Sequence, residues 1–161
     1  MKKIDKDGLL LCNLQAEAFE QSIGYINSSS EIFIRRFMNS NVAKFIDSGD
    51  ILQTNLIAKD ILDRVNEQYG ESSYGSTKYT ANEMYWIGYL YRYFSYTYDY
   101  SSSKVYKIVK PKELRGLFLP YHTMDTTAAI ERILEAKGML LDEEQELQRQ
   151  YRIFKKYRNI V

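Results

Sequence analysis

Hydrophobic residues recur at steps of three and four along most of the chain, which is the spacing of one face of an α-helix. The clearest stripes are Leu10, Leu11, Leu14, Ala18, Phe19, Ile23 and Ile26; Ile57, Ile61, Val65 and Tyr69; Ala129, Ile130, Ile133 and Leu134; and Leu147, Tyr151 and Phe154. Each stripe predicts a helix that buries this face. The sequence therefore predicts an all-α fold, a compact single-domain bundle of about seven helices over residues 1–161.

Capping residues indicate where these helices begin and end. Ser28 with Glu31, and Thr80 with Glu83, have the spacing of a capping box, in which two side chains satisfy free N–H groups at a helix start. Further N-caps are predicted at Thr54 or Asn55, Asp125 and Asp142, and helix ends at Gly70, Pro120 and Gly138. Residues 71–79 predict a loop, and residues 104–110 fit either a helix or a strand.

The helix predicted from Thr80 to Tyr98 carries large hydrophobic side chains on nearly every face. A helix of this kind is surrounded by neighbours, so we expect it at the centre of the bundle. Trp86 lies within it and is expected to be buried, so that truncation of this side chain would leave a large cavity.

Tyrosine is unusually frequent in this part of the chain. The sequence has 15 tyrosines, and ten of them lie between Tyr74 and Tyr106. On the central helix, tyrosines at steps of four, four and three share one face. Two interpretations remain open: a hydroxyl-rich core that ties helices together, or a surface for a partner protein, since tyrosine is enriched at interface centres. The candidate partner-binding residues are Tyr85, Tyr89, Arg92, Tyr93 and Tyr96.

The balance of charge argues against non-specific binding to nucleic acid. The chain has 22 basic and 21 acidic residues, for a net charge of +1, whereas binding of this kind draws on an excess of cations. Local basic patches keep a nucleic-acid-binding helical protein as the alternative function. Their residues are Arg35 and Arg36, next to aromatic residues, and Arg149, Arg152, Lys155, Lys156 and Arg158 in the last helix. The acidic start and basic end of that helix also complement its dipole.

The sequence shows no constellation of catalytic or metal-binding residues, so we expect neither an enzyme nor a cofactor. His122 is the only histidine and has no second nitrogen or sulfur ligand nearby; it is expected to bond a free carbonyl at a helix end. Cys12 is the only cysteine and lies among leucines, which predicts a buried, inert thiol. No phosphate-binding glycine motif is present.

The same single cysteine excludes a disulfide framework within the chain and fits a reducing compartment. Residues 1–7 are charged and show no signal peptide, and residues 84–98 carry too many polar groups for a membrane span. We therefore expect a cytoplasmic protein without membrane association.

Six stretches of the chain together resemble a known family. They are CNLQA (12–16), FIRRFMNS (33–40), QYGESSYG (68–75), MYWIGYLYRY (84–93), LPYHTMD (119–125) and AIERILEAK (129–137). The family comprises small uncharacterised proteins of Gram-positive, gut-type bacteria. Members are often encoded beside an ADP-ribosyltransferase-like toxin and another small helical protein. The resemblance covers most of the chain, to about Lys137, and the last helix is less typical.

This resemblance implies an antitoxin-like component of a toxin–antitoxin locus. Such a component binds and neutralises a partner protein, the toxin, and self-association into a homo-oligomer is also open. The family supplies no catalytic residues to carry over to this chain. The leading function is therefore protein binding, with nucleic-acid binding as the alternative.

Overall fold

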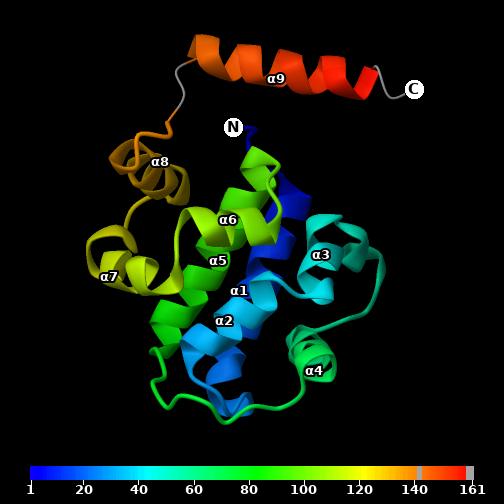
Figure 1. The fold of residues 1–161 in the computed structure, drawn as a ribbon, viewed down its shortest axis with the longest axis vertical. Helices are drawn as coiled ribbons and strands as arrows, with labels where there is room; N and C mark the ends of the chain where they lie inside the picture. Colours follow the sequence, from blue (N-terminus) through cyan, green and yellow to red (C-terminus); the bar gives the residue numbers. More distant parts are fainter. Residues whose placement is uncertain (141–142, 159–161) are drawn as a thin grey trace.

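The computed structural model describes residues 1–140 and 143–158, in which the chain forms nine α-helices, one 3-10 helix and no strand (Figure 1). The elements are α1 (Lys6–Tyr25), α2 (Ser30–Met38), α3 (Asn41–Asp47), η1 (Asp50–Gln53), α4 (Ala58–Tyr69), α5 (Ala81–Tyr98), α6 (Ser102–Ile108), α7 (Pro111–Tyr121), α8 (Thr126–Ala136) and α9 (Glu143–Arg158). The all-α prediction is confirmed. The helices outnumber the expected seven because the short segments α3 and α6 each form a helix.

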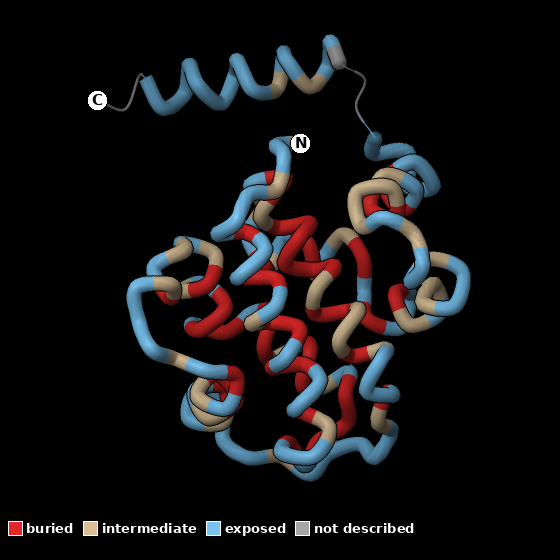
Figure 2. The backbone as a smooth tube through the Cα atoms, turned by 180° about the vertical axis from the view of Figure 1, so that it is seen from behind, coloured by how far each residue is buried: buried red, intermediate tan, exposed pale blue. Residues whose placement is uncertain are grey.

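Helix α5 is the centre of the body, as its apolar faces predict. It lies along α1 for most of its length and also contacts α6, α7 and α8 (Figure 1). Figure 2 shows that the buried backbone is concentrated in these central helices. Beside them, Phe19 of α1 packs edge-on against Phe33 and Phe37 of α2, with ring centroids 5.4 and 5.0 Å apart. These contacts join α2 to the α1–α5 pair.

The α1–α5 pair is close enough to require a glycine. A Cβ atom at Gly88 would lie 2.8 Å from Cγ of Phe19 and 3.1 Å from the backbone of Ala16. The backbone carbonyl of Gly88 also accepts a hydrogen bond from Nε2 of Gln15 at 3.0 Å. Because the two helix backbones touch here, neither can move apart without losing both the packing and a buried hydrogen bond.

The helix starts follow the predicted caps in part. Thr80 and Glu83 form the expected capping box: the Glu83 N–H donates to the Thr80 hydroxyl, and the Thr80 N–H donates to the Glu83 carboxylate. The capping box predicted at Ser28 is wrong by one residue. Ser29 is the N-cap, and its hydroxyl accepts a hydrogen bond from the backbone N–H of Ile32.

A tertiary contact explains the shift of this cap. The loop before α5 lies against the serine run: Ser29 donates its N–H to the carbonyl of Tyr74, and the Ser30 hydroxyl accepts from the N–H of Tyr79. Glu31 accepts a hydrogen bond from the Tyr79 hydroxyl at 2.7 Å instead of completing a box. The loop, which no local pattern connects with residues 28–31, thus selects the capping serine.

Two further predicted helix ends differ from the structure. Helix α4 begins at Ala58, so neither Thr54 nor Asn55 caps it; Ile57 is the N-cap and is 60% exposed rather than buried. Its backbone N–H donates to the Asp60 carboxylate, the contact that the acidic residue of a capping box makes, and Ile57 itself has no side-chain group to act as a cap. Pro120 lies inside the last turn of α7 and does not end the helix.

The remaining predicted ends are confirmed where the structure describes them. The Asp125 carboxylate caps α8 by accepting the Ala128 N–H. Gly70 and Gly138 follow α4 and α8 with φ of 78° and 68°, a left-handed conformation that favours glycine. The segment that fitted helix or strand is the helix α6, and the cap predicted at Asp142 lies outside the described residues.

Helix α9 differs most from its prediction. Leu147, Tyr151 and Phe154, the expected buried stripe, are 66%, 65% and 66% exposed. The helix stands beyond one end of the body and packs along no other helix in the described part of the chain (Figures 1 and 2). It is attached to the body by a polar contact, in which Glu146 accepts from the N-terminal amine at 3.2 Å; Glu146 also accepts from Arg149 of the same helix at 2.7 Å. These two cations lower the pKa of the Glu146 carboxyl to about 2.

The close contact at Gly88 generates a matched pair of substitutions. Gly88→Ala places a methyl group against Phe19 and the α1 backbone and is expected to lower the free energy of unfolding by about 1–3 kcal/mol. Gly116→Ala, within α7, meets open space and is expected to raise it by up to about 1 kcal/mol through helix propensity. Urea unfolding followed by circular dichroism measures both, and equal effects at the two positions would contradict the close packing.

Candidate functional site

The tyrosines proposed from the sequence do not form one surface. Tyr85 and Tyr89 are partly exposed near the start of α5, and their rings stack with centroids 6.4 Å apart. Tyr93 is only 8% exposed, and its hydroxyl bonds that of Thr127 on α8 at 2.8 Å. Tyr96 is partly exposed near the end of α5 and donates to Asp5 at 2.6 Å. Each interpretation of these tyrosines therefore holds for part of the set. Tyr93 and Tyr96 tie α5 to neighbouring segments, and the rings of Tyr85 and Tyr89 reach the surface.

Arg92 is wrong as a contact residue, because it is 1% exposed and lies inside the body. Position 92 is on the side of α5 that faces α1, α3 and α6. Its Nε donates to Gln15 at 2.8 Å, and Nη1 donates to Asp47 at 2.6 Å. Burial lowers the pKa of the guanidinium, and the Asp47 carboxylate opposes this shift by stabilising the charge. Arg92 is thus a structural ion-pair residue.

Ser102 closes this buried network. Its hydroxyl accepts from Nη2 of Arg92 at 2.8 Å and donates to Asp47 at 2.6 Å, while its backbone N–H donates to the second Asp47 oxygen at 3.0 Å. Sequence reasoning missed Gln15, Asp47 and Ser102, because they are far from Arg92 along the chain and belong to no local motif. Only the packing of four helices brings them together.

Tyr85 and Tyr89 line an open groove between α5 and α7. The groove has a volume of about 750 Å³, and its lining residues are Glu20, Asn82, Tyr85, Trp86, Tyr89, Phe118, Leu119 and His122. Its apolar wall is made by Trp86 and Phe118, which pack edge-on with ring centroids 5.8 Å apart. Leu119 stands at the rim and is 79% exposed. We refer to these eight residues as the aromatic groove.

Trp86 therefore belongs to a surface as well as to the core. It is partly exposed and packs against the core, so the cavity expected on its truncation stays a prediction, with the difference that the cavity would open to the surface. Sequence reasoning also missed the contribution of α7. The available signal was the step of four from Phe118 to His122, which places both rings on one helix face, where they stack with centroids 4.3 Å apart.

The groove offers apolar contact and neutral hydrogen-bond donors. Burial raises the pKa of both Tyr85 and Tyr89, so their hydroxyls stay protonated. Tyr85 donates to Asn13 at 3.1 Å. The ring of His122 bonds the Phe118 carbonyl through Nδ1 at 2.7 Å, as expected for a histidine at a helix end. This combination suits the binding of an apolar or aromatic side chain with polar groups at its edge.

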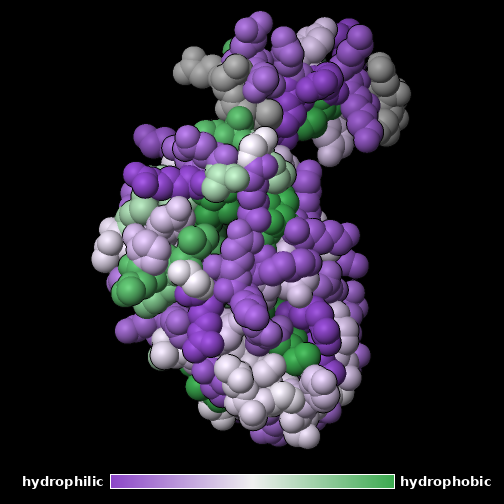
Figure 3. Space-filling model, turned by 60° about the vertical axis from the view of Figure 1, so that its left-hand side comes forward, coloured by the Kyte–Doolittle hydropathy of each residue, from purple (hydrophilic) through white to green (hydrophobic). Residues whose placement is uncertain are grey.

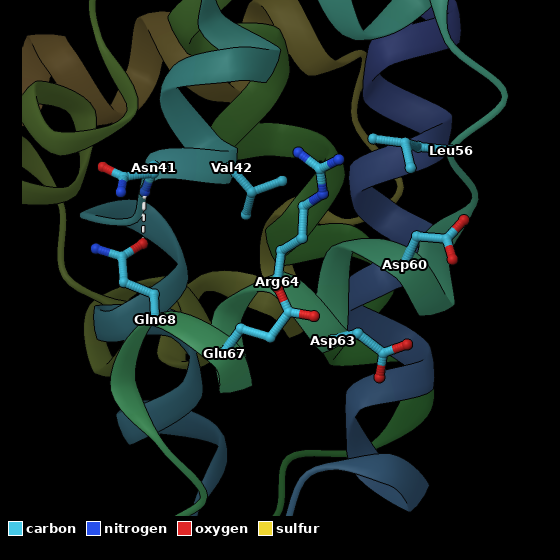
Figure 4. A pocket seen from close by; sticks show the side chains of 8 residues that line it. All are labelled: Asn41, Val42, Leu56, Asp60, Asp63, Arg64, Glu67 and Gln68. Atoms are coloured by element: carbon cyan, nitrogen blue, oxygen red, sulfur yellow. Dashed lines mark hydrogen bonds between the residues drawn. The ribbon is translucent and has the colours of Figure 1, made fainter.

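A second groove lies between α3 and α4, where Arg64 stands among the acidic side chains of Asp60, Asp63 and Glu67 (Figure 4). Two of these carboxylates already have partners: Asp60 accepts the Ile57 N–H, and Asp63 accepts the Tyr25 hydroxyl. Within residues 1–140 and 143–158, no group of three or more His, Cys, Asp or Glu side chains is arranged to hold a metal ion. This groove is a solvated helix face.

The basic residues of the nucleic-acid alternative are not brought together. Arg35 and Arg36 lie on α2, which is separated from α9 and its cations (Figure 1). Arg36 donates to the Gly70 carbonyl at 2.8 Å and packs over the ring of Tyr69. The arrangement gives no continuous basic surface between the two helices, so it does not favour nucleic-acid binding.

Cys12 is buried, as its neighbours predict, and burial raises the pKa of its thiol to about 12.

The described helices include none long and apolar enough to cross a membrane. No protein-family model, curated protein or solved structure matches the chain. The candidate site therefore rests on the geometry of the aromatic groove.

The buried network gives a prediction about stability. Asp47→Ala leaves the Arg92 guanidinium buried without its counter-ion and is expected to lower the free energy of unfolding by about 3–5 kcal/mol. Asp50→Ala, a nearby exposed acidic position, is the control and is expected to change it by less than about 0.5 kcal/mol. Urea denaturation measures both, and a small effect at Asp47 would show that Arg92 does not depend on this pair.

Proposed function

We propose that this protein binds a partner protein through the aromatic groove and acts as the toxin-neutralising, antitoxin-like component of a bacterial toxin–antitoxin locus. The observation that carries the binding role is the open groove itself, with Trp86 and Phe118 in its wall and Leu119 at its rim. Large apolar side chains held at a surface gain free energy when a partner covers them.

A protein partner suits this groove better than a small polar ligand. Aromatic residues are enriched at the centres of protein interfaces, where one or two side chains of the partner fill a pocket and the surrounding contacts exclude water. Glu20, Asn82 and the tyrosine hydroxyls supply a polar rim around the apolar wall. The side chains are also held in place: Phe118 packs between Trp86 and His122, so little freedom is lost on binding.

The toxin as partner rests on the family resemblance. Two of the resembling stretches, residues 84–93 and 119–125, supply five of the groove residues: Tyr85, Trp86, Tyr89, Leu119 and His122. These stretches are far apart in the sequence and meet at this groove. Neutralisation by binding requires contact area and no catalytic group. In this role the protein meets its toxin in the cytoplasm.

A charge at the rim tests the proposal without disturbing the core. Leu119→Arg is expected to weaken binding of the toxin encoded by the neighbouring gene by about 30-fold or more, because a hot-spot contact contributes about 2 kcal/mol or more. Ile57→Arg is the control: it charges an equally apolar, exposed position at the start of α4, away from the groove. Calorimetric titration measures the affinity, and rescue of cell growth by co-expression measures neutralisation.

Thermal unfolding establishes that both variants keep their fold. If Leu119→Arg binds as tightly as the unmodified protein, the aromatic groove is not the binding surface. If the unmodified protein neither binds the toxin nor rescues growth, the antitoxin-like role is wrong.

A further inference from the structure

Helix α9 carries an apolar stripe that the described chain leaves largely exposed, with only Phe154 at its edge lining a cleft between α9 and the body. Leu147, Tyr151 and Phe154 lie on one face at steps of four and three and are each about two-thirds exposed. Figure 3 shows hydrophobic side chains at the surface both on α9 and on the end of the body that it faces. An amphipathic helix attached through an ion pair with the N-terminal amine and exposed along its apolar face is arranged for docking rather than for the chain's own core.

The charges of α9 are separated along its length. Glu144 and Glu146 lie in its first half, where Arg149 pairs with Glu146, and Arg152, Lys155, Lys156 and Arg158 lie in its second. The helix dipole favours this order along the axis. It does not account for an apolar stripe that runs between the two charged ends. A surface that is acidic at one end, apolar in the middle and basic at the other is complementary to itself when turned around.

We propose that two copies of this chain associate through α9, which pairs with α9 of the second copy in an antiparallel arrangement. The two-fold axis passes beside Tyr151, so that this residue faces its own copy, as an isologous interface requires. Leu147 of each copy then packs next to Phe154 of the other, and the two apolar stripes cover one another.

The ends of the stripe provide the specificity. Glu144 and Arg158 are each seven residues from Tyr151, on opposite sides of it along the chain. In the antiparallel pair, Glu144 of each copy lies opposite Arg158 of the other, which gives two symmetric ion pairs at the ends of the interface. A parallel pair would instead place Glu144 opposite Glu144 and Arg158 opposite Arg158. The charge order therefore selects the antiparallel arrangement.

A second copy fits this face better than an anionic membrane or nucleic acid. Either of those would attract the second half of α9 and repel Glu144 in the first half. The pair is small, because a helix of 16 residues is only about 24 Å long. An interface of this size is below that of standard stable complexes, so we expect a dimer that dissociates in the micromolar range.

This dimer is independent of the proposed function. The aromatic groove involves the first turns of α5, through Asn82, Tyr85 and Trp86, whereas α9 lies beside the opposite end, near Thr97 and Tyr98. The groove thus stays open in the dimer, and each copy can bind a partner.

Sedimentation velocity of the full chain over roughly 1–200 µM tests the association. The unmodified protein is expected to shift from monomer to dimer with concentration. Tyr151→Glu places two carboxylates opposite one another at the axis and is expected to abolish the dimer. Lys156→Glu is the control: it introduces the same side chain five positions along, at an exposed residue on the side of the helix away from the stripe, and is expected to leave the dimer in place.

Charge reversal tests the antiparallel register. Glu144→Arg and Arg158→Glu are each expected to weaken the dimer about tenfold, because each places like charges together at both ends. An equal mixture of these two variants is expected to regain the dimer, since every reversed residue then meets an opposite charge on the other copy. Circular dichroism establishes that α9 keeps its helix content in each variant.

Three results would overturn the proposal. One is an unmodified protein that stays monomeric over the whole range, and another is a dimer that persists in Tyr151→Glu. The third is a mixture of the charge-reversed variants that dimerises no better than either variant alone. If the monomeric protein instead binds phosphatidylglycerol vesicles and Tyr151→Glu does not, the stripe serves a membrane surface and the dimer is likewise refuted.

Discussion

A buried guanidinium has to be paired on all sides, because an uncompensated charge inside a protein costs several kcal/mol. Arg92 meets this requirement with groups from three other helices: Gln15 on α1, Asp47 on α3 and Ser102 on α6. The network works only when all four helices are in place. The Asp47 carboxylate also accepts a hydrogen bond from the backbone N–H of Ser102, the first residue of α6. The ion pair therefore helps to fix where that helix begins. The arrangement of the body depends on this one interaction.

The network also determines which parts of α5 remain accessible. With α1, α3 and α6 gathered around Arg92, the middle of α5 is enclosed, whereas its first turns pack against α1 and α7. There the neighbours are fewer, and Trp86 stays partly exposed beside Phe118. The aromatic groove is a consequence of this uneven coverage. An interface built on it is rigid, because its wall is anchored in the same helix that holds the ion pair.

Helix α9 lies outside this arrangement. It adds no side chain to the Arg92 network and is attached to the body through the ion pair between Glu146 and the N-terminal amine. A polar attachment of this kind stabilises little, whereas three exposed apolar side chains favour an additional contact strongly. The body and α9 therefore differ: the body is built around a closed core, whereas the apolar face of α9 is largely exposed.

The sequence by itself determined the local features. The spacing of apolar residues predicted an all-α fold with residues 80–98 at its centre, and the pairs Thr80–Glu83 and Asp125–Ala128 behaved as caps because they depend only on neighbours within one helical turn. The burial of Cys12 and the carbonyl contact of His122 followed from their local surroundings for the same reason.

The tertiary structure decided whatever depends on distant groups. A helical spacing of apolar residues predicts that one face of the helix is apolar, but not that another part of the chain covers this face. Leu147, Tyr151 and Phe154 were therefore expected to be buried, whereas the structure leaves them largely exposed. Arg92 looked like a surface cation because Gln15, Asp47 and Ser102 are distant in sequence, and Ser29 became a cap because the loop near Tyr74 binds the serine run. Local patterns specify helices; which charges pair and which apolar faces close is decided by the packing of segments that the sequence keeps apart.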